Sequence, residues 1–154
     1  MLKVYVDGAC SGNGKSKNSG GWGLCIMDSN DNIIKTFSAY TEDTTNNREE
    51  LKAISAALAL VKDNPATIYS DSAYSLNTIN TWMYSWASKG WVKSDKKAPE
   101  NLDLIKPIYD YMAFRSNIKF EKVKGHSGIL GNEIADALAS NNRAKLSRLL
   151  TKEI

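Results

Sequence analysis

Residues 44–71 read TTNNREELKAISAALALVKDNPATIYSD, and their hydrophobic period changes from that of a helix to that of a strand. Apolar side chains first recur at intervals of three and four residues, at Leu51, Ile54, Leu58 and Val61. This spacing predicts an amphipathic helix over about 47–62. Residues 67–71 then read as a short strand, and a strand after a helix returns parallel to its predecessor. The segment therefore predicts an α/β domain.

Residues that favour the start and the end of a helix flank the predicted helix. Capping side chains precede it at Thr45, Asn46 and Asn47, and Glu49 or Glu50 follows where a capping box places its acid. Pro65 closes the connection to the next strand.

Three strands are expected before this helix. Residues 2–7 alternate between apolar and polar side chains, which predicts a strand that ends at Asp7. A glycine-rich loop follows, and then strand candidates at 22–27 and 33–40 are separated by turn-forming residues. The chain is therefore expected to open with an antiparallel three-stranded meander.

Two helices, a strand and a last helix are expected after residue 71. In order, they are a long helix that stops at Gly90, a helix capped by Asp103 that ends near Phe114, a strand at 118–123, and a helix at 132–142 whose pattern extends toward Leu150. The order βββαβααβα predicts one five-stranded mixed sheet, with its first three strands antiparallel, flanked by helices.

The composition indicates a single folded domain in the cytoplasm. The 154 residues are 42 % hydrophobic and 24 % charged, and no run approaches the roughly 18 apolar residues of a membrane helix. The net charge of +3 is too small to argue by itself for nucleic acid. Cys10 and Cys25 show no CxxC spacing, and His126 is the one histidine, which argues against a structural zinc site.

The placement of the acidic residues points to metal chemistry. Asp7 and Asp71 are expected at the carboxyl ends of two neighbouring parallel strands, where α/β sheets bind ligands. Glu50 lies in the first turn of a helix, and Asp136 shares a helix face with Glu133. Carboxylates that converge without basic partners repel one another unless a cation neutralises them. Hard divalent ions such as Mg²⁺ prefer these oxygens.

Five motifs then identify a family. They are VDGACSGN (6–13), TTNNREEL (44–51), YSDSAYS (69–75), KGHSGILGNEIAD (124–136) and ALA (137–139). In this order they resemble the type 1 ribonuclease H enzymes, in a bacterial-like form with a basic handle. The resemblance covers about residues 2–142 and implies the ribonuclease H-like fold for a domain over 1–142. Residues 143–154 form a C-terminal tail to which it assigns no role.

The resemblance also implies a reaction and its residues. The reaction is endonucleolytic hydrolysis of the RNA strand of RNA–DNA hybrids, giving 5′-phosphate and 3′-hydroxyl ends. Two Mg²⁺ ions, or Mn²⁺ as a substitute, would be held by the matching acids Asp7, Glu50, Asp71 and Asp136. His126 would assist proton transfer or product departure, and Glu133 would either tune metal exchange or be a solvated acid.

Further positions match places near the nucleic acid in this family. They are Asn13, Thr45, Asn46 and Ser72, of which Asn13 and Thr45 resemble a pocket for a DNA phosphate. Each is equally suited to cap a helix or form a turn. Residues 82–97, WMYSWASKGWVKSDKK, resemble the basic handle, with Trp82, Lys93, Lys96 and Lys97 as candidate substrate contacts. At least one of Trp82 and Trp86 is expected to pack the handle's helices together instead.

Several alternatives compete with this interpretation. GNGKS (12–16) suggests a phosphate-binding loop, but Ala9 stands where that motif needs glycine. A DNA-directed integrase or resolvase core, a non-catalytic hybrid-binding module, and a reverse transcriptase domain remain as rivals. Because Met1 directly precedes the first strand and all four acids are present, we expect a free-standing monomeric enzyme.

Overall fold

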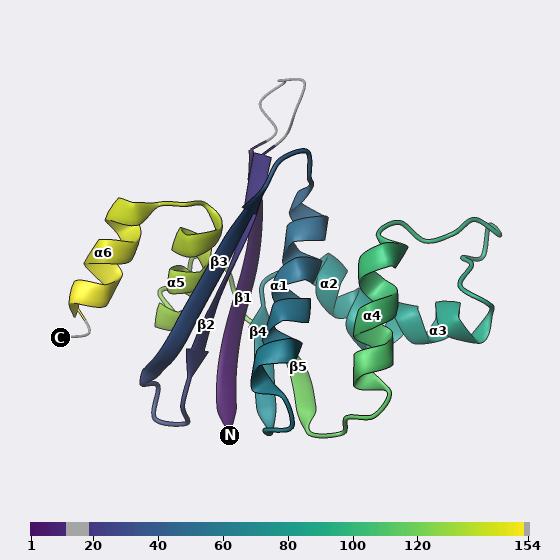
Figure 1. The fold of residues 1–154 in the computed structure, drawn as a ribbon, viewed down its shortest axis with the longest axis horizontal. Coiled ribbons are helices and arrows are strands. Elements are labelled where there is room, and N and C mark those ends of the chain that lie inside the picture. Colours follow the sequence, from purple (N-terminus) through teal and green to yellow (C-terminus); the bar gives the residue numbers. More distant parts are fainter. Residues whose placement is uncertain (12–18, 153–154) are drawn as a thin grey trace.

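The computed structural model describes residues 1–11 and 19–152. Its strands form one sheet in the order β3-β2-β1-β4-β5 (Figure 1). Their bounds are β1 Leu2–Ser11, β2 Ser19–Met27, β3 Ile33–Thr41, β4 Ala66–Ser70 and β5 Ile118–Lys122. β1, β2 and β3 pair antiparallel, whereas β4 is parallel to both β1 and β5. The predicted five-stranded mixed sheet is confirmed.

Helices cover both faces of this sheet. The helical segments are α1 Asn46–Val61, α2 Ala73–Asn77, the π-helical η1 Thr78–Trp82, α3 Met83–Ser88, α4 Leu102–Met112, α5 Leu130–Ala139 and α6 Arg143–Lys152. α1 packs against β1 and β2 and also contacts α4 (Figure 1). α5 packs against β1, β2 and β3, and α6 packs against α5. Among the described residues, no helix combines the length and apolar character that crossing a bilayer requires.

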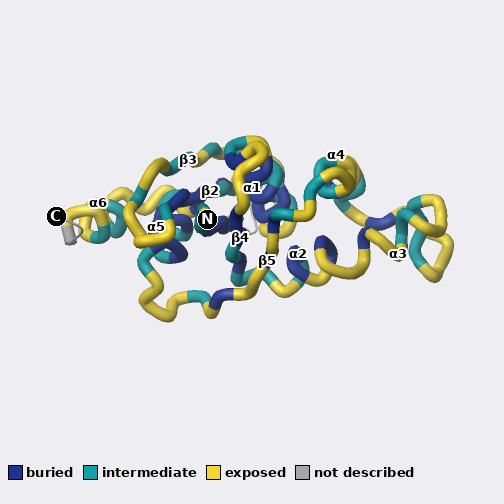
Figure 2. The backbone as a smooth tube through the Cα atoms, turned by 90° about the horizontal axis from the view of Figure 1, so that it is seen from below, coloured by how far each residue is buried: buried dark blue, intermediate teal, exposed yellow. Residues whose placement is uncertain are grey.

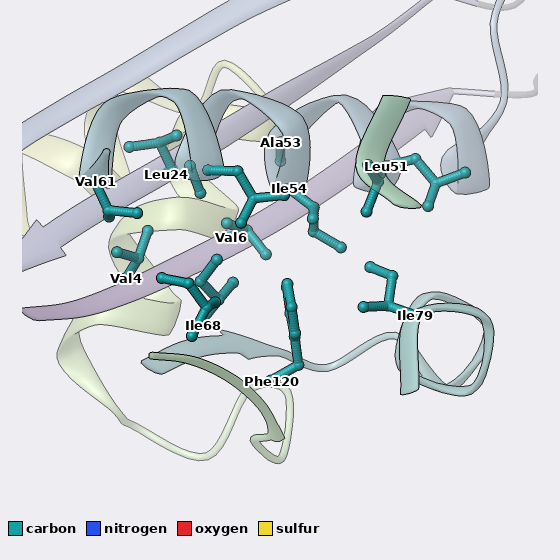
Figure 3. Packing of buried hydrophobic residues seen from close by; sticks show 14 of the residues in the cluster. Val4, Val6, Leu24, Leu51, Ala53, Ile54, Val61, Ile68, Ile79 and Phe120 are labelled. Carbon is teal, nitrogen blue, oxygen red and sulfur yellow. The ribbon is translucent and has the colours of Figure 1, made fainter. Parts of the chain in front are cut away.

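Alternation along β1 divides the interior into two hydrophobic clusters. Val4 and Val6 face α1 in the larger cluster, where they meet Ile54 and Ile68 (Figure 3). Tyr5, between them in sequence, points to the opposite face and packs in the cluster of α5. Buried residues are concentrated in the sheet, α1 and α5, whereas the segment around α3 and the outer part of α6 is largely exposed (Figure 2).

β1 is longer than its alternation predicted. It does not end at Asp7, because its pairing with β2 continues to Ser11 opposite Ser19. The expected glycine-rich loop is therefore partly strand, since Gly20 and Gly21 lie within β2. A Cβ added at Gly23 would lie 2.6 Å from the carbonyl oxygen of Ala135, so this glycine allows α5 to approach the sheet closely.

The predicted capping box of α1 is wrong. Thr45 is the N-cap, and its hydroxyl accepts a hydrogen bond from the backbone N–H of Arg48 at 3.1 Å. Glu49 is fully buried, and its Oε2 accepts from the Thr44 hydroxyl at 2.8 Å and pairs with Lys52 at 3.0 Å. Side chains therefore pair with one oxygen of this acid, whereas its Oε1 is buried without a hydrogen-bond partner.

The middle helices differ from expectation in their boundaries. The long helix expected up to Gly90 is a succession of α2, η1 and α3, with a π-helical turn in its middle. α4 begins after Asn101, which adopts a left-handed φ of 61°, and not after Asp103. Asp103 instead pairs with Arg48 at 2.8 Å. Pro107 consequently lies inside α4, where its missing N–H removes one helical hydrogen bond.

The last helix is interrupted. α5 ends at Ala139, and Asn141 takes a left-handed φ of 54° that reverses the chain direction. The Asn142 side chain then accepts a hydrogen bond from the backbone N–H of Lys145 at 3.1 Å, in the first turn of α6. Leu146 and Leu149 of α6 are partly buried against the hydrophobic cluster of α5, so α6 packs on the domain.

Ile68→Ala should lower the free energy of unfolding by about 2–5 kcal/mol, because the truncated side chain leaves a cavity between the sheet and α1. Ile68 is fully buried. Ile34→Ala is the matched control, since Ile34 also lies on a strand but is 54 % exposed. Urea unfolding would measure both variants, and equal losses would contradict the packing described above.

Candidate active site

Three acids from three separate elements meet at the sheet. Asp7 lies on β1, Glu50 in the first turns of α1, and Asp71 directly after β4. One oxygen from each lies within 4.8 Å of the others. Asp7 and Glu50 are buried, with 6 % and 3 % of their surfaces exposed. The parallel pairing of β1 with β4, which aligns Tyr5 with Tyr69, brings Asp7 and Asp71 to the same end of these strands.

Two glycines permit this convergence. A Cβ at Gly8 would collide with the backbone nitrogen of Glu50, so only glycine lets β1 approach the start of α1. A Cβ at Gly125 would lie 2.8 Å from Oδ2 of Asp71, so a side chain at this position of the loop before α5 would displace the carboxylate.

The electrostatics of the cluster favour protonated acids. Burial, together with the neighbouring charges of Glu50 and Asp71, raises the pKa of Asp7 to about 9. Burial also raises the pKa of Glu50 to about 8, although the Ser70 hydroxyl donates to Glu50 Oε1 at 2.5 Å and opposes the shift. The pKa of Asp71 is raised by burial and by the charge of Asp136. Without a cation, these groups resist being charged together.

A second group of possible ligands adjoins the first. Atoms of His126, Glu133 and Asp136 lie within 4.8 Å of one another, and Asp136 shares a hydrogen bond with Asp7. His126 is exposed in the loop before α5, with a left-handed φ of 55°. The structure thus brings the four sequence-predicted acids together with His126 and Glu133.

Lys145 on α6 also reaches this second group. Its Nζ lies 2.7 Å from Oδ2 of Asp136 and 2.6 Å from Oε2 of Glu133. Burial raises the pKa of Asp136, but the bonds from Lys145 and Asp7 outweigh it and lower the pKa overall. The expectation that the acids converge without basic partners is therefore wrong for Asp136. Sequence reasoning missed Lys145 because it lies in the tail beyond the matched motifs.

The other predicted substrate contacts lie in different settings. Thr45 and Ser72 cap α1 and α2, and each hydroxyl accepts a hydrogen bond from a backbone N–H at 3.1 Å. Asn46 is exposed in the first turn of α1, beside the buried acids Glu49 and Glu50. Asn13 lies outside the described residues.

The handle, residues 82–97, projects beyond α4 on the side away from α5 and α6 (Figure 1). Trp82 is 40 % exposed, and its ring lies 6.1 Å from that of Trp86. Lys93 pairs loosely with Asp95 at 3.8 Å, whereas Lys96 and Lys97 are exposed. Trp86 packs against the larger hydrophobic cluster, whereas Trp82 is partly exposed.

Comparison with known proteins places this geometry in a family. The sequence model described as RNase H matches residues 1–144. A ribonuclease H of Francisella philomiragia subsp. philomiragia is 42 % identical over 145 residues, covering 94 % of this chain and 91 % of the relative. A ribonuclease H of Caldicellulosiruptor saccharolyticus is 41 % identical over 138 residues, covering 88 % of this chain and 91 % of the relative.

Solved structures agree with the sequence relatives. LC9-RNase H1, a type 1 RNase H with the type 2 active-site motif, superimposes with a TM-score of 0.76 at 28 % identity, covering 90 % of this chain and 69 % of the other. A foamy viral protease-reverse transcriptase in complex with an RNA/DNA hybrid gives a TM-score of 0.81 at 25 % identity, covering 90 % of this chain but 19 % of that larger one. With its four acids gathered on this fold, the chain belongs to the RNase H family.

Proposed function

We propose that this protein is an endoribonuclease that hydrolyses the RNA strand of RNA–DNA hybrids and leaves 5′-phosphate and 3′-hydroxyl ends. The observation that carries the proposal is the convergence of Asp7, Glu50 and Asp71 within 4.8 Å, with Asp136 hydrogen-bonded to Asp7. Family membership supports the same reaction, because the curated relatives over most of this chain are ribonuclease H enzymes.

The acids fit divalent metal ions. Their oxygens are the ligands that Mg²⁺ prefers. Burial first, and the neighbouring acids second, raise the pKa values of Asp7 and Glu50, and a bound cation would favour the charged carboxylates instead. Asp7, Glu50, Asp71 and Asp136 would hold two ions, Asp7 serving both, Glu50 and Asp71 the first and Asp136 the second. When bound, such a pair supplies an activated water and stabilises the leaving 3′ oxygen. We take Mg²⁺ as the natural ion and Mn²⁺ as a substitute.

His126 and Glu133 complete the proposed machinery. His126 is exposed on a loop next to Asp136, so it can exchange protons with solvent while it faces the scissile phosphate. Glu133 lies one helical turn before Asp136 on α5 and would tune how metal is held there.

The substrate would lie across the polar residues around the acids. Proteins recognise RNA-containing duplexes through 2′-hydroxyls in a wide, shallow minor groove, largely by shape. Asn13, Thr45, Asn46 and Ser72 are assigned to this recognition, with Thr45 and Asn13 at a DNA phosphate. The handle would extend the contact through Trp82 and its lysines, whose attraction to phosphates is independent of base sequence.

A non-catalytic hybrid-binding module is the second candidate. Such a module has no need of four converging carboxylates, whose mutual repulsion costs free energy in the folded state. The burial of Asp7 and Glu50 therefore favours an enzyme. On this proposal the enzyme acts as a monomer in the cytoplasm, with residues 1–142 as its catalytic domain.

The metal-free protein should lose stability as pH rises. The pKa of Asp7 is 3.8 ordinarily and about 9 in the fold, so its folded state favours the protonated acid. The stability that this group contributes is complete below about pH 4 and is lost as pH rises through about 9. Melting temperatures in chelator should therefore fall between about pH 5 and pH 9, and Asp7→Asn should flatten that slope. The exposed Asp110→Asn serves as control; an unflattened slope in Asp7→Asn would contradict the assignment.

Asp7→Asn should reduce cleavage of an RNA–DNA hybrid by about 1,000-fold or more, because it removes a metal ligand's charge while keeping its volume. Folding and hybrid binding should persist. The assay compares matched RNA–DNA, RNA–RNA and DNA–DNA duplexes of one sequence, in Mg²⁺ and in chelator. Cleavage by the wild type should be confined to the hybrid in Mg²⁺. Retained turnover in Asp7→Asn would refute the catalytic assignment.

Replacing Lys93, Lys96 and Lys97 with Gln should raise the KM for the hybrid by roughly tenfold at low salt, because the variant releases fewer counterions from the phosphates when it binds. The increase in KM should be smaller at higher salt, where counterion release contributes less to binding. The kcat of the triple variant should stay close to that of the wild type, because these lysines lie in the handle and not among the acids. A matched control replaces three exposed cations outside the handle, Lys35, Lys119 and Arg148. If both triple variants raise KM equally, the handle has no specific role in binding.

A further inference from the structure

The active site contains a cation supplied by the protein itself. Lys145 Nζ forms two short ion pairs, at 2.7 Å with Asp136 and at 2.6 Å with Glu133. These three side chains are 19 %, 25 % and 14 % exposed, so the pairs are shielded from solvent more than most surface pairs. The same two acids belong, with His126, to the second group of possible metal ligands.

The position of Lys145 is held by its helix. The Asn142 side chain accepts a hydrogen bond from the Lys145 backbone N–H, and the Asn142 backbone N–H donates to the carbonyl of Ala137 at 2.8 Å. Leu146 and Leu149 anchor the same helix on the hydrophobic cluster of α5. The first turn and the apolar face of α6 are thus both attached to α5. These contacts place the ammonium group of Lys145 next to the two acids.

The two groups of ligands differ in charge balance. Within residues 1–11 and 19–152, Asp7, Glu50 and Asp71 form no ion pair with a lysine or arginine, whereas Asp136 and Glu133 share Lys145. A divalent ion bound at about 2.1 Å to the oxygens that Lys145 contacts would occupy the space of the ammonium and repel its charge. An ion that uses these two oxygens must therefore displace Lys145.

We infer that Lys145 is a competing internal cation, which weakens divalent metal binding at Asp136 and Glu133 and has a much smaller effect on binding at Asp7, Glu50 and Asp71. This inference rests on the proposed two-metal function and adds a positioning residue that sets the metal concentration the enzyme requires. This effect of Lys145 follows from linkage. A group that pairs with the metal-free carboxylates lowers the apparent affinity of the divalent ion that has to displace it.

A Mg²⁺ titration of the substrate-free, full-length protein tests the inference, with backbone amide NMR signals as local reporters. The amide of Asp136 reports one ligand group and that of Gly8 the other. In Lys145→Met, the Mg²⁺ midpoint at Asp136 should fall by roughly fivefold, while that at Gly8 stays within about twofold. Lys145→Arg, which keeps the charge, should retain a midpoint near that of the wild type.

The control is Arg148→Met, which removes an exposed cation from the same helix and should change neither midpoint. A merely structural role for Lys145 would lower the melting temperature equally in chelator and in Mg²⁺ and leave both midpoints unchanged, which would overturn the inference. A higher Asp136 midpoint in Lys145→Met would also overturn it. Lys145→Gln replaces the Met variant if that variant fails to fold.

The titration contains no nucleic acid, so its outcome is separate from that of the cleavage assay. If hybrids are not cleaved but the Asp136 midpoint shifts as expected, the proposed function fails and the cation competition stands. If hybrids are cleaved and the midpoint does not move, the inference about Lys145 alone fails.

Discussion

Repulsion among buried carboxylates is the constraint on which the rest of this structure depends. Asp7 and Glu50 are almost fully buried, and each faces a further acid. Such a cluster costs free energy unless protons or cations neutralise it. Burial and the neighbouring acids raise the pKa of Asp7 to about 9, so protonation is one way to neutralise the cluster. A divalent cation is the alternative, and it turns an unfavourable cluster into a site for phosphodiester chemistry.

The fold keeps these acids together by close backbone approach. Gly8 lets β1 touch the first turn of α1, and Gly125 lets the loop before α5 pass against Asp71. The two hydrophobic clusters on either face of the sheet hold α1 and α5 in place. Rigid elements packed on both sides thus supply the packing free energy that offsets the electrostatic cost of the site.

The active site is also electrically asymmetric. Asp7, Glu50 and Asp71 offer oxygens within 4.8 Å of one another and, among the described residues, pair with no lysine or arginine, whereas Glu133 and Asp136 share Lys145. Residues of α6, which continues beyond the family match at residue 144, are therefore adjacent to the candidate active site. A segment outside the shared motifs can in this way alter the metal dependence of a shared mechanism.

The sequence by itself determined the α/β class, the strand order along the chain and the identity of the four acids. These features are encoded locally, in the helical period of residues 51–61, in the alternation of β1, and in short motifs around each acid. The tertiary structure alone decided the true length of β1, the break between α5 and α6, and the pairing of Lys145 with Asp136. Each of these depends on a partner distant in sequence or on a left-handed backbone turn, and neither leaves a periodic pattern along the chain.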